Sequence, residues 1–133
     1  MIIANIPGKP NSWKRPKHNR ARILFNANKV ATAAFRQQLR EFRPDELWDG
    51  PVQVHLIFFF ERPATHFLGG VLSAEAPGWC TNPCDVDNLA KFVMDALQTV
   101  LFVNDKQVTT LKAEKMWAAT GEGARTEVVA YQV

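Results

Sequence analysis

The sequence predicts an α+β domain in which a mixed β-sheet carries two main helices packed on it. The chain has 133 residues, the usual length of one domain, and 47% of them are hydrophobic, which is enough for one packed core. Its segments follow the order strand, helix, strand, long loop, helix, strand, strand. A chain of this order builds one sheet and covers it with helices, so we treat residues 1–133 as a single domain.

The first third of the chain predicts a short strand and a helix. Met1–Ile6 alternates well enough for a strand, and the turn dipeptide Pro7-Gly8 ends it. A helix is expected over residues 28–43, because apolar residues recur there at steps of three and four and Pro44 follows. These apolar residues are Val30, Ala34, Phe35, Leu39 and Phe42.

The remainder predicts a buried strand, a long loop, a second helix and two more strands. Pro51–Glu61 is apolar on one face and partly apolar on the other, as in a largely buried strand. Arg62–Cys84 is irregular and too long for an ordinary connection, which is typical of a functional loop. Asp87–Thr99 has the wide apolar face of an amphipathic helix. Gln107–Ala118 and Arg125–Val133 are expected to be strands.

Charge is divided unevenly along the chain. The first 40 residues hold nine Lys and Arg and no acid, whereas the other 93 hold seven basic and thirteen acidic residues. This split predicts a polyanion as partner of the basic surface; the alternative is a solvated loop that only aids solubility. Residues 9–22 form the expected basic arm, since they contain Pro10 and Pro16 and show no apolar periodicity. The arm's candidate contacts are Lys9, Lys14, Arg15, Lys17, Arg20 and Arg22.

Two carboxylates lie where the long loop enters the second helix. Asp85 and Asp87 are two residues apart, so in extended geometry their side chains converge. Oxygen ligands of this kind favour Mg²⁺, with Mn²⁺ as the alternative, and Lys91 lies one helical turn farther on. The other interpretation is structural: Asp87 caps the helix and Lys91 pairs with it. Spacing alone leaves both interpretations open.

A third acid, Asp105, follows the second helix in a polar break of the chain. A helix from Asn88 to Gln98 is about 16 Å long. The residues from Thr99 to Asp105 span up to about 23–25 Å when extended, so a return to Asp85 is feasible. Three arrangements remain open: a cluster of three aspartates in one chain, Asp105 supplied by a partner subunit, or a simple turn aspartate.

The chain resembles the RusA-type Holliday junction resolvases, specifically over residues 84–107 and more loosely over residues 6–17, and its length fits that of the family's domain. The matching segments are Asp85-Val86-Asp87-Asn88-Leu89 with Lys91, Asp95-Ala96-Leu97, Val100-Leu101-Phe102 with Asn104-Asp105 and Gln107, and, more loosely, Ile6-Pro7-Gly8-Lys9-Pro10 with Lys14-Arg15-Pro16. One departure is that Pro83-Cys84 stands where the family often has Lys-Pro.

The resemblance implies a homodimeric, Mg²⁺-dependent endodeoxyribonuclease that cuts four-way DNA junctions in recombination and repair. It assigns metal and catalytic roles to Asp85, Asp87 and Asp105, and the role of the essential lysine to Lys91; the basic arm would bind DNA. Two alternatives remain: a nuclease for other branched DNA, and a DNA-binding module without catalysis.

The sequence also predicts a cytoplasmic protein without a membrane segment. No apolar run approaches the roughly 18–20 residues that cross a bilayer. The first residues lack the basic start of a secretory signal. Cys80 and Cys84 are too few for a disulfide framework and lack further ligands for zinc, so we expect two reduced thiols.

Overall fold

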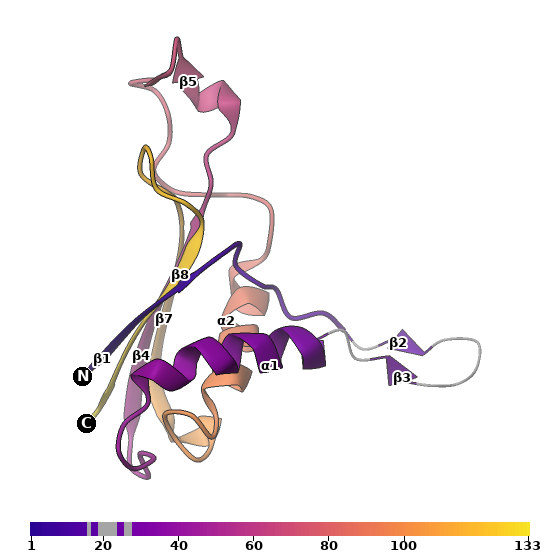
Figure 1. Ribbon diagram of the computed structural model, residues 1–133, viewed down its shortest axis with the longest axis vertical. Coiled ribbons are helices and arrows are strands. Elements are labelled where there is room, and N and C mark those ends of the chain that lie inside the picture. The colour runs from indigo at the N-terminus through magenta and orange to yellow at the C-terminus, as the bar shows by residue number, and fades with distance from the viewer. Residues whose placement is uncertain (16, 19–23, 26–27) are drawn as a thin grey trace.

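The computed structural model describes residues 1–15, 17–18, 24–25 and 28–133. Its main sheet has the strand order β1-β8-β4-β7, in which β4 and β7 are parallel and the other neighbours antiparallel. The strands are β1 (Ile2–Pro7), β4 (Val52–Phe60), β7 (Val108–Trp117) and β8 (Arg125–Gln132). Two helices, α1 (Asn28–Leu39) and α2 (Val86–Leu97), cover one face of this sheet (Figure 1). The expected mixed sheet with two helices is therefore confirmed.

Smaller elements connect the sheet and the helices. The 3₁₀ turns are η1 (Arg40–Phe42), η2 (Ala64–His66) and η3 (Asp105–Gln107). Two short hairpins pair β2 (Lys17–His18) with β3 (Leu24–Phe25) and β5 (Phe67–Leu68) with β6 (Val71–Leu72). Both hairpins project from the body of the domain, β2–β3 beyond the start of α1 and β5–β6 at the opposite extremity to the chain termini (Figure 1).

The core lies between the sheet and the two helices. Alternate residues of β4, from Val52 to Phe60, are buried, as the period of two predicts. The apolar face of α2 packs on them, and α2 meets α1 through the edge-to-face rings of Phe35 and Phe92, whose centroids are 5.6 Å apart. Arg36 strengthens the same contact, because its guanidinium donates hydrogen bonds to two carbonyls in the last turn of α2. The two helices thus form one rigid layer.

The structure differs from the sequence prediction at the ends of both helices. The first helix ends at Leu39 and continues only as the 3₁₀ turn η1. Val30, expected on the apolar face, is 79% exposed, whereas the polar Asn28 is buried by the arm. The second helix ends at Leu97 because Thr99 takes a left-handed conformation (φ 67°) and its N–H donates to the carbonyl of Phe102.

The long segment before α2 contains more regular structure than expected. It folds into η2 and the β5–β6 hairpin, whose turn is formed by Gly69 and Gly70. Both glycines have positive φ, the conformation that a two-residue hairpin turn requires. Among the helices of the described residues, none has the length and apolar character needed to cross a membrane.

Candidate active site

The N-terminus of α2 presents two carboxylates to solvent. Asp85 occupies the N-cap position, but its side chain makes no capping hydrogen bond, and Asp87 lies in the first helical turn. Both residues are exposed, and within the described residues neither carboxylate has a hydrogen-bond or ion-pair partner. The capping role that sequence left open for Asp87 is therefore absent. Two unpartnered carboxylates at this spacing repel each other unless a cation lies between them.

Main-chain contacts with the sheet hold the segment that leads into α2. The N–H of Cys80 donates to the carbonyl of Lys115, and the N–H of Trp117 donates to the carbonyl of Gly78, at 3.2 and 2.9 Å. The Lys115 ammonium donates in turn to the carbonyl of Cys84, the residue before Asp85. The two aspartates are consequently placed by the edge of β7 as well as by the start of the helix.

Lys91 lies on the same helix, one turn after Asp87, and is exposed. Within the described part of the chain its ammonium forms no ion pair with Asp87 or Asp95, which removes the pairing that sequence allowed as an alternative. The ammonium lies instead over the indole ring of Trp13, 4.7 Å from the ring centroid. The first half of α2 therefore carries a positive charge that neither Asp87 nor Asp95 neutralises.

The start of the basic arm runs past this helix end. The main-chain N–H of Trp13 donates to the carbonyl of Asn88 in the first turn of α2, at 3.0 Å. The next residue, Lys14, is fixed by the side chain of Asn28, which accepts from its N–H at 2.8 Å and donates to its carbonyl at 2.7 Å. A hollow of about 280 Å³ between the arm and α2 is lined in part by Lys14 and Cys84.

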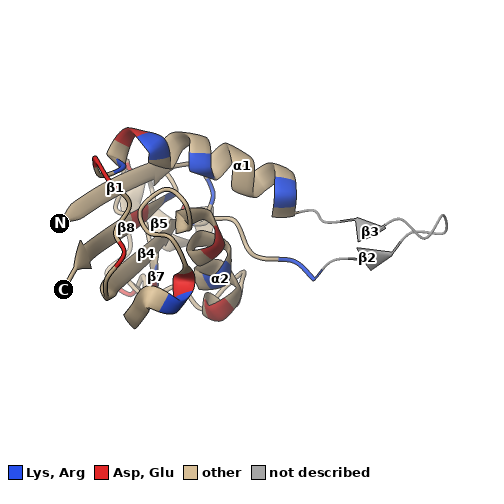
Figure 2. Cartoon of the chain, turned by 90° about the horizontal axis from the view of Figure 1, so that it is seen from below, with Lys and Arg blue, Asp and Glu red and all other residues tan. Residues whose placement is uncertain are grey.

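Some of the basic residues of the arm lie in the part of the chain that the structure describes. Lys9, Lys14 and Arg15 are exposed, so they are free to meet a polyanion, and Lys17 lies in β2. Arg20 and Arg22 lie outside the described residues. In Figure 2 a blue segment of the arm lies near the start of α1, and further blue segments lie toward the other end of α1.

Asp105 is built into a different end of the molecule. It is the first residue of η3, which has a capping box: the Asn104 side chain accepts from the N–H of Lys106 at 2.9 Å, and the Gln107 side chain accepts from the N–H of Asn104 at 2.8 Å. The Gln107 amide also donates to the carbonyl of Trp48, 2.8 Å away, just ahead of β4. Asp105 is exposed, and these contacts hold it at the C-terminal side of α2.

The single chain does not bring the three aspartates together. Asp85 and Asp87 begin α2, whereas Asp105 follows its other end, and a helix of 12 residues is about 18 Å long (Figure 1). Among the described residues no group of three His, Cys, Asp or Glu could hold a metal ion. The expectation of one cluster within the chain is thus corrected. The return path is long enough, but the capping box and Trp48 hold Asp105 beside the start of β4.

Three contacts around the site were not anticipated from sequence: Trp13 beside Lys91, Asn28 clamping Lys14, and Lys115 behind Cys84. Trp13 had a weak signal, because an aromatic residue amid basic ones either stacks on a base or anchors the arm. Lys115 had none, since the sequence of a strand does not show which loop carbonyl a lysine side chain contacts.

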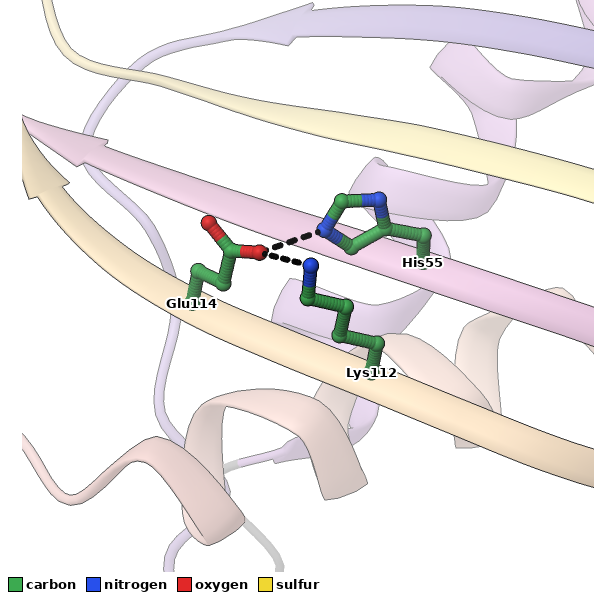
Figure 3. A network of polar contacts seen from close by, with 3 residues as sticks. All are labelled: His55, Lys112 and Glu114. Carbon is green, nitrogen blue, oxygen red and sulfur yellow. Dashed lines mark hydrogen bonds and ion pairs between the residues drawn. The ribbon is translucent and has the colours of Figure 1, made fainter.

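A separate polar network lies on the sheet face away from the helices. Glu114 accepts from Lys112 at 2.8 Å and contacts His55 at 3.0 Å (Figure 3). The hydrogen bond from Lys112 is the main cause that lowers the pKa of Glu114 below its ordinary value, with His55 adding to it. The network therefore stabilises the fold above the ordinary pKa of a glutamate, and this contribution is lost as the pH falls through the lowered pKa.

Comparisons with known proteins support the resemblance. The sequence profile described as "Endodeoxyribonuclease RusA" matches residues 7–129, from the end of β1 into β8. The matched range includes both helices, the aspartates at 85, 87 and 105, and the basic arm. Comparison with curated proteins found no match. Because the profile covers nearly the whole chain, this protein belongs to the RusA family of endodeoxyribonucleases.

Proposed function

We propose that the protein is a Mg²⁺-dependent nuclease that cuts four-way DNA junctions as a homodimer, in recombination and repair. The observation that carries the proposal is the pair of exposed, unpartnered carboxylates of Asp85 and Asp87 beside the unneutralised ammonium of Lys91. Family membership supplies the reaction class, and it argues against a DNA-binding module without catalysis.

The donor atoms at the start of α2 suit a hard divalent cation. Asp85 and Asp87 offer only carboxylate oxygens, and Mg²⁺ is commonly held by one or two carboxylates together with water and substrate phosphate. No nitrogen or sulfur ligand is needed. When bound there, Mg²⁺ supplies an activated water and neutralises charge on the phosphate.

The chain's own groups orient and stabilise the phosphate. The first turn of α2 carries backbone N–H groups without helical partners, which favour an anion. Lys91, one turn away, places a cation where negative charge develops on the phosphate oxygens during hydrolysis. Lys14 and Arg15, in the arm docked on the same helix end, provide further phosphate contacts.

The position of Asp105 favours a site shared between two subunits. In one chain it lies at the other end of α2 from Asp85, so it joins that site only if a second copy supplies it. A twofold dimer would then contain two equivalent sites, each with Asp85, Asp87 and Lys91 of one protomer and Asp105 of the other. Two such sites suit paired cuts on the symmetry-related strands of a junction.

Cleavage assays with defined DNA structures test the proposed function. We expect cleavage of a synthetic four-way junction in Mg²⁺, none with a chelator, and none of a linear duplex of the same sequence. A flap and a fork of matched arms distinguish the junction from other branched DNA. Equal cleavage of the linear duplex, or cleavage that persists with the chelator, would contradict the proposal.

The basic arm and Lys91 are expected to act at different stages. Lys14→Ala with Arg15→Ala weakens junction binding and flattens its salt dependence, because each lost phosphate contact lowers the log–log slope by about 0.7–0.9. Lys91→Ala leaves binding nearly unchanged and slows cleavage at saturating protein. Filter binding across a salt series and single-turnover cleavage measure the two effects.

The matched control for the arm variant is Arg40→Ala with Arg43→Ala, two exposed arginines after the end of α1, outside the arm. It removes the same two positive charges and should lower the salt slope by less than one phosphate contact. If the arm variant and Lys91→Ala alter binding and saturated rate to the same degree, this division of roles is wrong.

A further inference from the structure

We propose that Trp13 is a positioning residue that holds the Lys91 ammonium in place and thereby links the docking of the basic arm to the cleavage step. This inference rests on the proposed nuclease function, in which Lys91 stabilises the phosphate. It adds a role for an aromatic residue that carries no reactive group of its own.

The ammonium of Lys91 lies over the indole ring of Trp13. The Nζ atom of Lys91 lies 4.7 Å from the centroid of the Trp13 ring, within the range in which an ammonium is attracted by the negative face of an indole. Tryptophan is the strongest partner for such a contact. Trp13 is half-buried and packs against the core, so its ring is a fixed surface.

The Lys91 side chain needs a restraint if its ammonium is to stay in one place. The side chain is exposed and has four rotatable carbon bonds, so it samples many rotamers unless something restrains it. Asp87 and Asp95, the acids one helical turn away on either side, form no ion pair with it. Across the described residues, the Trp13 indole is the one group that contacts its ammonium. An ion pair with an acid would have weakened the attraction of the Lys91 ammonium for a phosphate, whereas a neutral ring leaves its full positive charge available.

Hydrogen bonds to both helices hold the part of the arm that carries the ring. The main-chain N–H of Trp13 donates to the carbonyl of Asn88 in α2. The side chain of Asn28 in α1 bonds to both the N–H and the carbonyl of the next residue, Lys14. The segment that carries the indole is thus fixed between α1 and α2, by a main-chain bond to α2 and by the side chain of Asn28 in α1. Lys14 and Arg15, which we expect to contact phosphates, follow it directly, so the arm can bind DNA in register with Lys91 only while Trp13 is docked.

The same geometry argues against free stacking of Trp13 on a DNA base. A stacking platform needs an exposed aromatic face. Here the ring is partly covered by the protein core and one face carries the Lys91 ammonium. We therefore expect the effect of removing the ring to appear in the rate at saturation more than in the affinity.

A spectroscopic test follows the contact without relying on activity. In protein carrying ¹³C-labelled lysine, the ring current of the indole shifts the ε-methylene signal of Lys91 upfield, and Lys91→Arg identifies that signal by its loss. We expect Trp13→Leu to move the signal to the position of free lysines and Trp13→Phe to leave part of the shift. Trp48→Leu, at the other end of α2, is the matched control and should leave it in place.

Single-turnover cleavage of a four-way junction in Mg²⁺ completes the test. Trp13→Leu should slow the saturated rate about two- to fivefold, the factor that corresponds to a cation–π contact of about 0.5–1 kcal/mol, and Trp13→Phe should recover part of the loss. An unchanged Lys91 signal in Trp13→Leu, or a weaker affinity with an unchanged saturated rate, would overturn the inference. If the wild-type protein cleaves no branched DNA, the proposed function fails, while the lysine signal still decides whether Trp13 holds Lys91.

Discussion

Asp85→Asn is expected to abolish Mg²⁺-dependent cleavage and to leave junction binding intact or tighter. The amide keeps the shape of the carboxylate but removes a negative ligand, so the affinity for the cation falls and the repulsion of phosphate decreases. Loss of the metal-activated water costs several kcal/mol of transition-state stabilisation, or a rate decrease of at least about a thousandfold. Junction affinity by filter binding and single-turnover cleavage measure the two quantities.

Asp45→Asn is the matched control for this substitution, because it makes the same chemical change at an exposed aspartate outside both helices. It should cleave at the wild-type rate. Asp87→Asn and Asp105→Asn should behave like Asp85→Asn. Combining these substitutions should slow cleavage little further, because the rate effects of residues that serve one site do not add. Cleavage by Asp85→Asn at the wild-type rate in Mg²⁺ would show that the metal assignment is wrong.

Phe92→Ala is expected to lower the free energy of unfolding by about 3–5 kcal/mol. Phe92 is 1% exposed, and its ring meets Phe35 of α1 edge to face, so truncation leaves a cavity between the two helices. It also follows Lys91 directly, so the same cavity loosens the helix turn that carries the site. Denaturant unfolding followed by circular dichroism measures the free energy of unfolding. An unchanged slope m would show that the surface exposed on unfolding is the same in the variant and the wild type.

The control for this prediction is Val103→Ala, because Val103 is 55% exposed and its truncation removes little buried apolar surface. Its truncation should change the free energy of unfolding by no more than about 0.5 kcal/mol. A loss below about 1 kcal/mol for Phe92→Ala would mean that the contact between α1 and α2 contributes little to the stability of the domain.

Features with a local cause could be predicted from the sequence. The alternation in Pro51–Glu61 reports one face of a strand, and the apolar face of the second helix follows from its period, so β4 and α2 were found with ends correct to within two residues. The placement of Asp85 and Asp87 at the start of that helix could be predicted because both lie on one short segment of the sequence. The basic arm was visible from composition alone.

Features that depend on contacts between distant segments could not be predicted. Chain length sets how far Asp105 can reach, but its direction is decided by the bond from Gln107 to the carbonyl of Trp48. The burial of Asn28 depends in the same way on the arm folding back over α1, and the exposure of Val30 on the absence of any partner for that helix face among the described residues. No periodicity within a single segment encodes these contacts.

Subunit mixing tests the central claim, a metal site shared between two protomers, most directly. Asp85→Asn and Asp105→Asn proteins, each inactive alone, are combined under conditions that allow exchange of subunits and are assayed on a four-way junction in Mg²⁺. In a shared site the mixed dimer has both substitutions in one site and none in the other, so we expect nicking of one strand to reappear. If each site lay within one chain, both sites of the mixed dimer would be defective. A mixture as inactive as its components, with exchange verified by differently tagged subunits, would contradict the account.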